Sequence, residues 1–141
     1  PSTSSNVTIE ADLADGTAVA GETKISRART PIDRIRLNPA AAKPLPEALE
    51  AIAQADLITF GPGSLFTSVI PNLLVDGIPR AIRRSRARTA YFVNLMWQPW
   101  ETMHFSAADH ILALERHAGP RLLDWVIVNT HPISGARRRR Y

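Results

Sequence analysis

The segment that follows the short apolar run 57–60 contains residue types suited to binding an anion. Gly61 and Gly63 let the backbone approach a ligand closely, and successive N–H groups can form a concave anion site. A helix that starts near Ser64 would add its positive dipole end. Ser64 could instead cap that helix, and glycines often serve the turn alone, so a phosphate-binding loop and an ordinary turn both stay open. The candidate phosphate-binding residues are Gly61, Pro62, Gly63, Ser64, Leu65, Thr67 and Ser68.

Polar side chains also follow the next two strand-like runs. Asn94 comes directly after the run 89–93, and Asn129 follows the run 124–128. In a parallel sheet these positions share the carboxyl edge with the glycine loop, and α/β proteins bind ligands at that edge. Each residue alone could simply close a turn. The candidate ligand-binding residues here are Asn94, Gln98, Glu101, Thr102 and Asn129.

Several of the remaining polar and aromatic residues have competing interpretations. Glu101 could orient a sugar hydroxyl or accept a proton, although a solvated surface position is the default for a glutamate. Trp97 and Trp100 could stack on a base or sugar, cover the core, or form a partner interface. Asp109 stands at capping-box spacing from Ser106, so we predict that it satisfies a helix start.

The sequence favours neither a metal site nor a nucleophilic hydrolase. His110 and His117 lie two helical turns apart, too far to share one ion on a straight helix, and we predict ordinary surface or partly buried histidines. No serine lies in a Gly-x-Ser-x-Gly turn, so a hydrolase triad has no support. The absence of cysteine excludes disulfides, thiolate zinc sites and cysteine nucleophiles.

The pattern of apolar residues predicts an α/β fold. Helices over 45–54, 79–85 and 106–117 alternate with strands over 57–60, 89–93 and 124–128, and a short helical turn over 64–69 ends near Pro71. This alternation is typical of a parallel sheet with right-handed crossovers. The region 1–44 is predicted to be a small β-rich subregion, with strands 7–13 and 17–25 around the Asp15-Gly16 turn and a third over 32–37.

Length and charge limit the classes of partner. The 141 residues fit one α/β domain, divided into the β-rich subregion 1–44 and the alternating region 45–141. The net charge is +4, and Arg137–Arg140 account for it, since the other 13 basic residues balance the 13 acidic ones. The arginines of 80–88 most often form a solvated helix face. We therefore expect a cytoplasmic protein that neither binds nucleic acid nor inserts into a membrane.

An ordered set of sequence blocks resembles the gluconeogenesis-factor family (YvcK-like). The blocks are Gly61–Ser68, Pro71–Val75, Asn94–Met96 with Gln98, Glu101–Thr102 and Ser106–His110, and the 15–22 segment also matches. That family is related to the 2-phospho-L-lactate transferases (CofD-like) of deazaflavin cofactor synthesis. The resemblance implies a Rossmann-like fold and a nucleotide ligand of the UDP-N-acetylglucosamine type, with a role in carbon metabolism and cell-envelope or cell-shape maintenance.

Positions can be carried over from the resemblance. It implies phosphate contacts for Gly61, Gly63, Ser64 and Thr67, places Asn94 and Gln98 beside the ligand, and makes Tyr141 a candidate nucleotide-sugar contact. The family's opening strand, its Gly-Gly-Gly-Thr-Gly loop and its C-terminal portion have no counterpart here, so we expect a bacterial fragment of a longer protein.

Three functions follow as expectations. The first is a binding protein with a regulatory role. The second is a phospholactyl transferase that would need magnesium; the family acid of the 97–104 loop is missing here, which counts against it. The third is a homo-oligomerising interaction module built on the β-rich subregion and the two loop tryptophans. Apart from the nucleotide ligand, no cofactor is expected with certainty, and a homo-oligomer is expected in each case.

Overall fold

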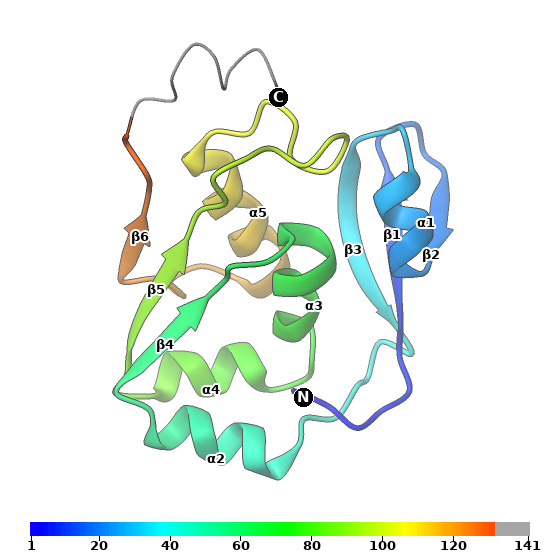
Figure 1. Cartoon of the computed structure of the whole chain (residues 1–141). Coiled ribbons are helices and arrows are strands. Elements are labelled where there is room, and N and C mark those ends of the chain that lie inside the picture. Colours follow the sequence, from blue (N-terminus) through cyan, green and yellow to red (C-terminus); the bar gives the residue numbers. More distant parts are fainter. Residues whose placement is uncertain (132–141) are drawn as a thin grey trace.

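The computed structural model of the protein describes residues 1–131 and contains two three-stranded sheets on either side of a layer of helices (Figure 1). One sheet is antiparallel and the other is parallel, as the α/β prediction required. The helices α3 (Ile70–Leu73) and α5 (Ala107–Ala118) lie between the sheets.

The antiparallel sheet has the order β2-β1-β3. Its strands are β1 (Thr8–Leu13), β2 (Ala18–Ala20) and β3 (Ile32–Asn38). The pairs Ala11–Ile35 and Ile9–Leu37 face the interior, whereas Glu10–Arg36 and Asp12–Arg34 face outward. The residues Glu10, Asp12, Arg34, Arg36 and Asn38 form the charged outer face of this sheet.

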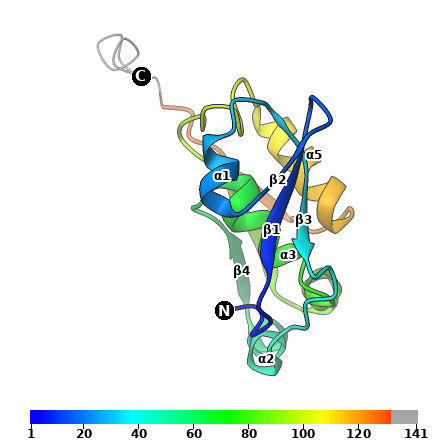
Figure 2. The ribbon, with the colours of Figure 1, turned by 90° about the vertical axis from the view of Figure 1, so that its right-hand side faces the viewer.

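The predicted strand 17–25 is wrong in its second half. The strand β2 ends at Ala20, and residues Glu22–Arg27 form the short helix α1, which packs against β1 and β2 (Figure 2). Gly21 has φ 94°, a turn that ends the extended backbone, and its carbonyl accepts from the N–H groups of Lys24 and Ile25. The helical turn buries Ile25, the one large apolar side chain of this segment, in the core.

The parallel sheet has the order β4-β5-β6, with the strands β4 (Leu57–Phe60), β5 (Arg88–Phe92) and β6 (Trp125–Ile127). Phe60 pairs with Tyr91 on the inner face, and both side chains are buried. On the other side, the outer face of the parallel sheet carries Leu57, Thr59, Arg88, Ala90, Phe92, Trp125 and Ile127.

The helices near the parallel sheet begin where the sequence indicated. The helix α2 (Pro46–Gln54) precedes β4, and α4 (Ile78–Arg84) precedes β5 with Pro79 in its first turn. The helix α5 starts with the predicted capping box, in which Ser106 and Asp109 bond each other's backbone N–H groups. None of the helices within residues 1–131 has the length and apolar character needed to cross a bilayer.

Two local predictions need correction. The turn at Leu65–Val69, a wide helical turn labelled η1, does not end near Pro71 but continues into α3. Pro71 lies in the first turn of α3, where its fixed φ is compatible with the helical backbone. His110 is also fully buried, at 3% exposure, because α5 presents it to Tyr91 and Phe105.

Candidate functional site

The loops that follow β4 and β5 meet at the carboxyl edge of the parallel sheet. The two strands pair in parallel, so Gly61 and Val93 leave the sheet on the same side. Asn94 extends its amide across this edge, and its Nδ2 donates to the Gly63 carbonyl oxygen at 2.9 Å. The structure therefore brings together the glycine loop and Asn94, two of the regions that the sequence singled out.

The loop 61–64 is packed too closely for larger residues. Gly61 has φ 85°, and a Cβ atom there would lie 3.2 Å from the Phe92 carbonyl oxygen. A Cβ atom on Gly63 would lie 3.2 Å from the Ser68 Cβ. Both glycines thus favour the close fit of the loop against β5 and η1, whatever ligand the loop holds.

Backbone donors remain available in this loop. Within residues 1–131, the N–H groups of residues 63–66 have no hydrogen-bond acceptor, whereas the Thr67 N–H donates to Ser64 Oγ at 3.2 Å. Consecutive unpaired N–H groups are the donors of concave anion sites. The side chains of Leu65 and Thr67 are buried, at 0% and 6% exposure. Leu65 can therefore offer a ligand only its backbone N–H, whereas the Thr67 N–H is already bonded to Ser64.

A buried carboxylate lies next to these donors. Glu101 is 5% exposed, and its Oε2 accepts a hydrogen bond from Ser64 Oγ at 2.6 Å. The default expectation of a solvated glutamate is therefore wrong. The Ser64 hydroxyl oxygen caps η1 by accepting a hydrogen bond from the Thr67 N–H, and its proton is donated to Glu101. In this arrangement the hydroxyl therefore does not donate to a phosphate.

The turn after β5 holds Glu101 in place. The N–H groups of Glu101 and Thr102 donate to the Gln98 carbonyl oxygen, and the Gln98 N–H donates to Thr102 Oγ1 at 3.0 Å. Thr102 is fully buried, and Trp100 stands at φ 65°. This tight turn directs Glu101 toward Ser64, a contact between residues 37 positions apart in the sequence.

The tryptophans of this loop are exposed. Trp97 is 56% and Trp100 is 39% exposed, so neither covers the core. The indole N–H of Trp97 donates to the Phe105 carbonyl oxygen at 3.3 Å, and its ring meets the His104 ring edge-on with the centroids 4.9 Å apart. Of the three predicted roles, stacking on a ligand and contact with a partner stay predictions.

The remaining predicted residues lie at exposed positions or outside the described residues. Asn129 is exposed, and its Oδ1 accepts from the His131 N–H at 3.0 Å, so it closes its own turn. Pro62 lies within the loop 61–64, and Ser68 lies in η1, where its N–H donates to the Ser64 carbonyl oxygen; both residues are exposed. Tyr141, the candidate nucleotide-sugar contact, lies outside the described residues.

Beneath the site are buried polar atoms whose burial the sequence did not predict, although Gln98 was among the candidate ligand-binding residues. Tyr91 Oη, Gln98 Oε1 and His110 Nε2 have no hydrogen-bond partner within the described chain. The Tyr91 and His110 rings lie 6.2 Å apart, and burial raises the pKa of the Tyr91 hydroxyl to about 12. No local signal predicts the burial of Tyr91 and His110, because it depends on how α5 packs against β5. Within residues 1–131, no three side chains of metal-binding type come together.

Comparison with known proteins supports the sequence resemblance. The family model of the 2-phospho-L-lactate transferase CofD matches residues 1–141. The gluconeogenesis factor of Halalkalibacterium halodurans is 44% identical over 141 residues, and that of Bacillus subtilis is 41% identical over the same length. Each match covers 100% of this chain and 44% of the relative, so the chain spans less than half the length of the curated relatives it matches.

A solved structure has the same fold. The crystal structure of a UPF0052 family member from Bacillus halodurans superposes with a TM-score of 0.93 at 44% sequence identity, covering 99% of this chain and 45% of that one. The α/β fold and the family resemblance are both confirmed. The chain belongs to the family described by the 2-phospho-L-lactate transferase CofD model, and the relatives it matches are gluconeogenesis factors.

Proposed function

We propose that this chain is the portion of a gluconeogenesis-factor-type regulatory protein that binds a nucleotide diphosphate sugar, with UDP-N-acetylglucosamine as the leading ligand. The proposal rests mainly on two kinds of hydrogen-bonding group that lie close together at the carboxyl edge of the parallel sheet, backbone N–H donors and a carboxylate acceptor. Four N–H groups at residues 63–66, which have no partner within residues 1–131, are suited to a diphosphate, and the Glu101 carboxylate lies beside them.

The carboxylate narrows the class of ligand. An ionised glutamate only accepts hydrogen bonds, and it repels a second anion. Glu101 Oε2 is occupied by Ser64, and within residues 1–131 no side chain or backbone group donates to Oε1. A ligand that presents a diphosphate to the loop and a hydroxyl to Glu101 satisfies both, and a nucleotide sugar carries these two groups. Asn94 and Gln98 then border the same ligand, and Trp97 or Trp100 offers a stacking surface.

Calorimetric titration of the natural full-length protein tests this proposal. We expect UDP-N-acetylglucosamine to bind. The Glu101→Gln substitution should lower the affinity for this ligand about tenfold or more, and should lower the affinity for UDP less. The matched control is Glu115→Gln, because within the described chain the Glu115 side chain makes no hydrogen bond. If the Glu101→Gln variant binds UDP-N-acetylglucosamine as tightly as the wild type does, Glu101 does not contact the ligand. Binding of an unrelated nucleotide, with no heat from UDP-N-acetylglucosamine, would overturn the function.

A transferase is the second candidate, favoured by the match to the 2-phospho-L-lactate transferase family model. It would move a phospholactyl group from a nucleotide diphosphate to a deazaflavin-type acceptor, with magnesium. Turnover of such an acceptor by the full-length protein in magnesium would establish it, whereas ligand binding without turnover favours the regulatory role. For either candidate, a cytoplasmic location and a homo-oligomeric state belong to the proposal, and fractionation with light scattering tests both.

A further inference from the structure

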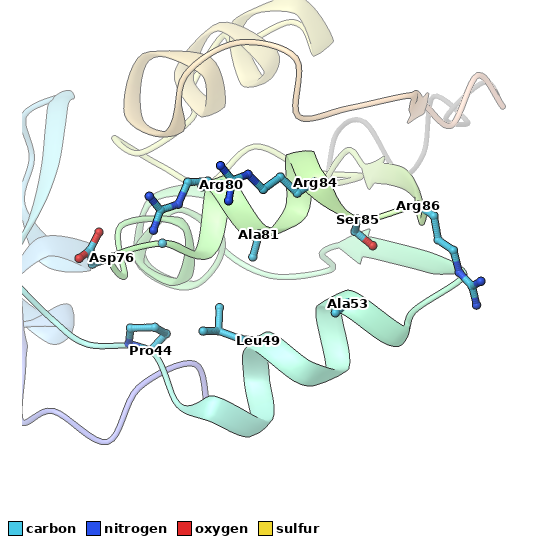
Figure 3. A pocket seen from close by; sticks show the side chains of 10 residues that line it. Pro44, Leu49, Ala53, Asp76, Arg80, Ala81, Arg84, Ser85 and Arg86 are labelled. Atoms are coloured by element: carbon cyan, nitrogen blue, oxygen red, sulfur yellow. The ribbon is translucent and has the colours of Figure 1, made fainter.

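A second concave surface lies at the opposite end of the parallel sheet from the candidate site. It is a groove of about 710 Å³ between α2 and α4, called here the α2–α4 groove (Figure 3). Its residues Ser85 and Arg86 lie just before β5, so it borders the amino ends of the strands. The glycine loop and Glu101 lie at the carboxyl ends. A molecule in the groove therefore does not compete with the proposed nucleotide ligand.

The apolar surface of the groove is incompletely buried. Leu49 and Ala53 of α2 face Ala81 of α4 across it (Figure 3). Although α2 is an amphipathic helix, none of its residues is fully buried, and Leu49 is only half-buried. A helix of this kind gains most of its stability from covering its apolar face. The groove thus offers apolar surface that a further element can cover.

The rim of the groove is positive. Arg80 and Arg84 stand one turn apart on α4, both exposed, and their side chains extend along the helix toward its amino end (Figure 3). Within the described chain, neither arginine comes within ion-pair distance of a carboxylate. Like charges at this spacing slightly destabilise a helix, so the two arginines together do not stabilise α4.

Arg83, on the same helix, shows the contrast. Its Nη1 donates to the Ala118 carbonyl oxygen at 2.9 Å, at the last residue of α5, and so has a structural role. Arg86 makes a long 3.8 Å pair with Asp56, in which both side chains are largely exposed. Asp76 is the acidic residue of the groove lining. Within residues 1–131, the rim therefore presents Arg80 and Arg84 without a carboxylate partner, beside an apolar surface.

We propose that the α2–α4 groove binds an acidic amphipathic helix of a partner protein. Carboxylates one turn apart on that helix would pair with Arg80 and Arg84, and its apolar side chains would cover Leu49 and Ala53. A groove between two helices accepts a third helix by the same packing that joins the first two. Nucleic acid fits less well, because a phosphate backbone offers nothing to the apolar surface.

The test uses a designed probe and the full-length protein. The probe is a fluorescent helical peptide of about five turns with leucines on one face and glutamates one turn apart beside them. Two matched peptides carry glutamine for glutamate or serine for leucine, and a short DNA duplex is the fourth probe. We expect anisotropy titrations to show binding of the first peptide alone in the micromolar range, with affinity that falls as salt rises.

Variants locate the binding surface. The double substitution Arg80→Glu and Arg84→Glu is expected to weaken binding of the acidic peptide by about tenfold or more. Arg27→Glu with Arg29→Glu changes the net charge equally at exposed positions near β3 and is expected to have no effect. Leu49→Ser tests the apolar surface, and circular dichroism checks that each variant is folded.

Two results would overturn the proposal. One is acidic-peptide binding that is the same in the Arg80/Arg84 variant as in the control. The other is tighter binding of the DNA duplex that the same variant abolishes, which would make this a nucleic-acid surface. Calorimetry with UDP-N-acetylglucosamine on the same variants separates this result from failure of the proposed function, because the two sites lie at opposite ends of the sheet.

Discussion

The two sheets of this protein differ in what they present to their outer faces. In the antiparallel sheet the outer face is charged, and Arg36 pairs with Asp12 at 2.7 Å and with Glu10 at 3.4 Å. In the parallel sheet the corresponding face exposes large apolar side chains. These are Leu57, Phe92, Trp125 and Ile127, which are 53%, 41%, 51% and 45% exposed.

This difference shows that the two sheets have different sequence requirements. The antiparallel strands alternate between apolar and charged residues, as expected for one buried and one solvated face. Apart from Thr59 and Arg88, the outer face of the parallel sheet is apolar like its inner face, a composition typical of parallel sheets that are covered on both sides. Charged side chains therefore complete the outer face of one sheet, whereas the outer face of the other is apolar without being buried within the described residues.

The largest expected effect comes from two neighbouring residues of β5 that point to opposite faces. Tyr91→Ala should lower the free energy of unfolding by about 3–5 kcal/mol, because Tyr91 is 1% exposed and its removal leaves a cavity. Phe92→Ala should cost less than about 1 kcal/mol, because its side chain is 41% exposed. Urea unfolding of both variants measures the difference. A similar loss for both would mean that the outer face is covered in solution.

The turns of the two sheets provide the second comparison. Gly16 follows β1 at φ 83° with open space where a side chain would begin, whereas Gly61 follows β4 at φ 85° and faces the Phe92 carbonyl oxygen. Gly16→Ala should cost about 1–2 kcal/mol for the left-handed backbone alone. Gly61→Ala should cost about 2–3 kcal/mol because the contact adds to it. Equal shifts in the unfolding midpoint would show that the loop after β4 relaxes freely.

Local patterns in the sequence were sufficient for much of this fold. Short apolar runs between helical segments located the strands of the parallel sheet, and the Ser106–Asp109 spacing located the start of α5. The helix α1 escaped prediction because its six residues carry no helical period, and only the burial of Ile25 explains it.

The candidate site was predictable in its loops and not in its chemistry. The glycines and Asn94 follow strands, so their shared edge follows from the parallel topology. The burial of Glu101 depends on Ser64, which is distant in the sequence, and reverses the ordinary expectation for a glutamate. Contacts of this kind are decided by tertiary packing, which residue type and spacing do not encode.

His117 gives the third prediction, because it connects α5 to the antiparallel sheet. Its Nε2 accepts from the Ile35 N–H at 2.9 Å, and its Nδ1 lies 2.7 Å from the Ala113 carbonyl oxygen, so the bonded ring is neutral. Burial lowers the pKa of His117, as do Arg34 and Arg116, while the bond to Ala113 and the charge of Asp33 oppose the shift.

The direction of the shift sets the pH window. A histidine with a lowered folded pKa contributes stability that is fully present above its ordinary value of about 6.5 and is lost as pH falls through the folded pKa. The midpoint of denaturant unfolding should therefore decrease as the pH is lowered from 7.5 to about 5 in the wild type. The decrease should be smaller in His117→Gln. Asp12 and Asp15, whose pKa values are also lowered, lose their contributions only in more acidic solution. An unchanged pH dependence in the variant would contradict this role.

The smallest effect on stability is expected on the outer face of the parallel sheet. Phe92→Thr with Ile127→Thr replaces a cross-strand apolar pair by residues that favour strands equally well. The free energy of unfolding should change by less than about 1 kcal/mol, because both side chains are partly exposed. Binding of a dye that fluoresces on apolar surface should fall clearly, since contiguous exposed apolar patches bind such dyes. The matched control is Arg34→Thr on the charged outer face, which should leave dye binding unchanged. Equal dye binding by the wild type, the double variant and Arg34→Thr would contradict the difference in apolar character between the outer faces of the two sheets.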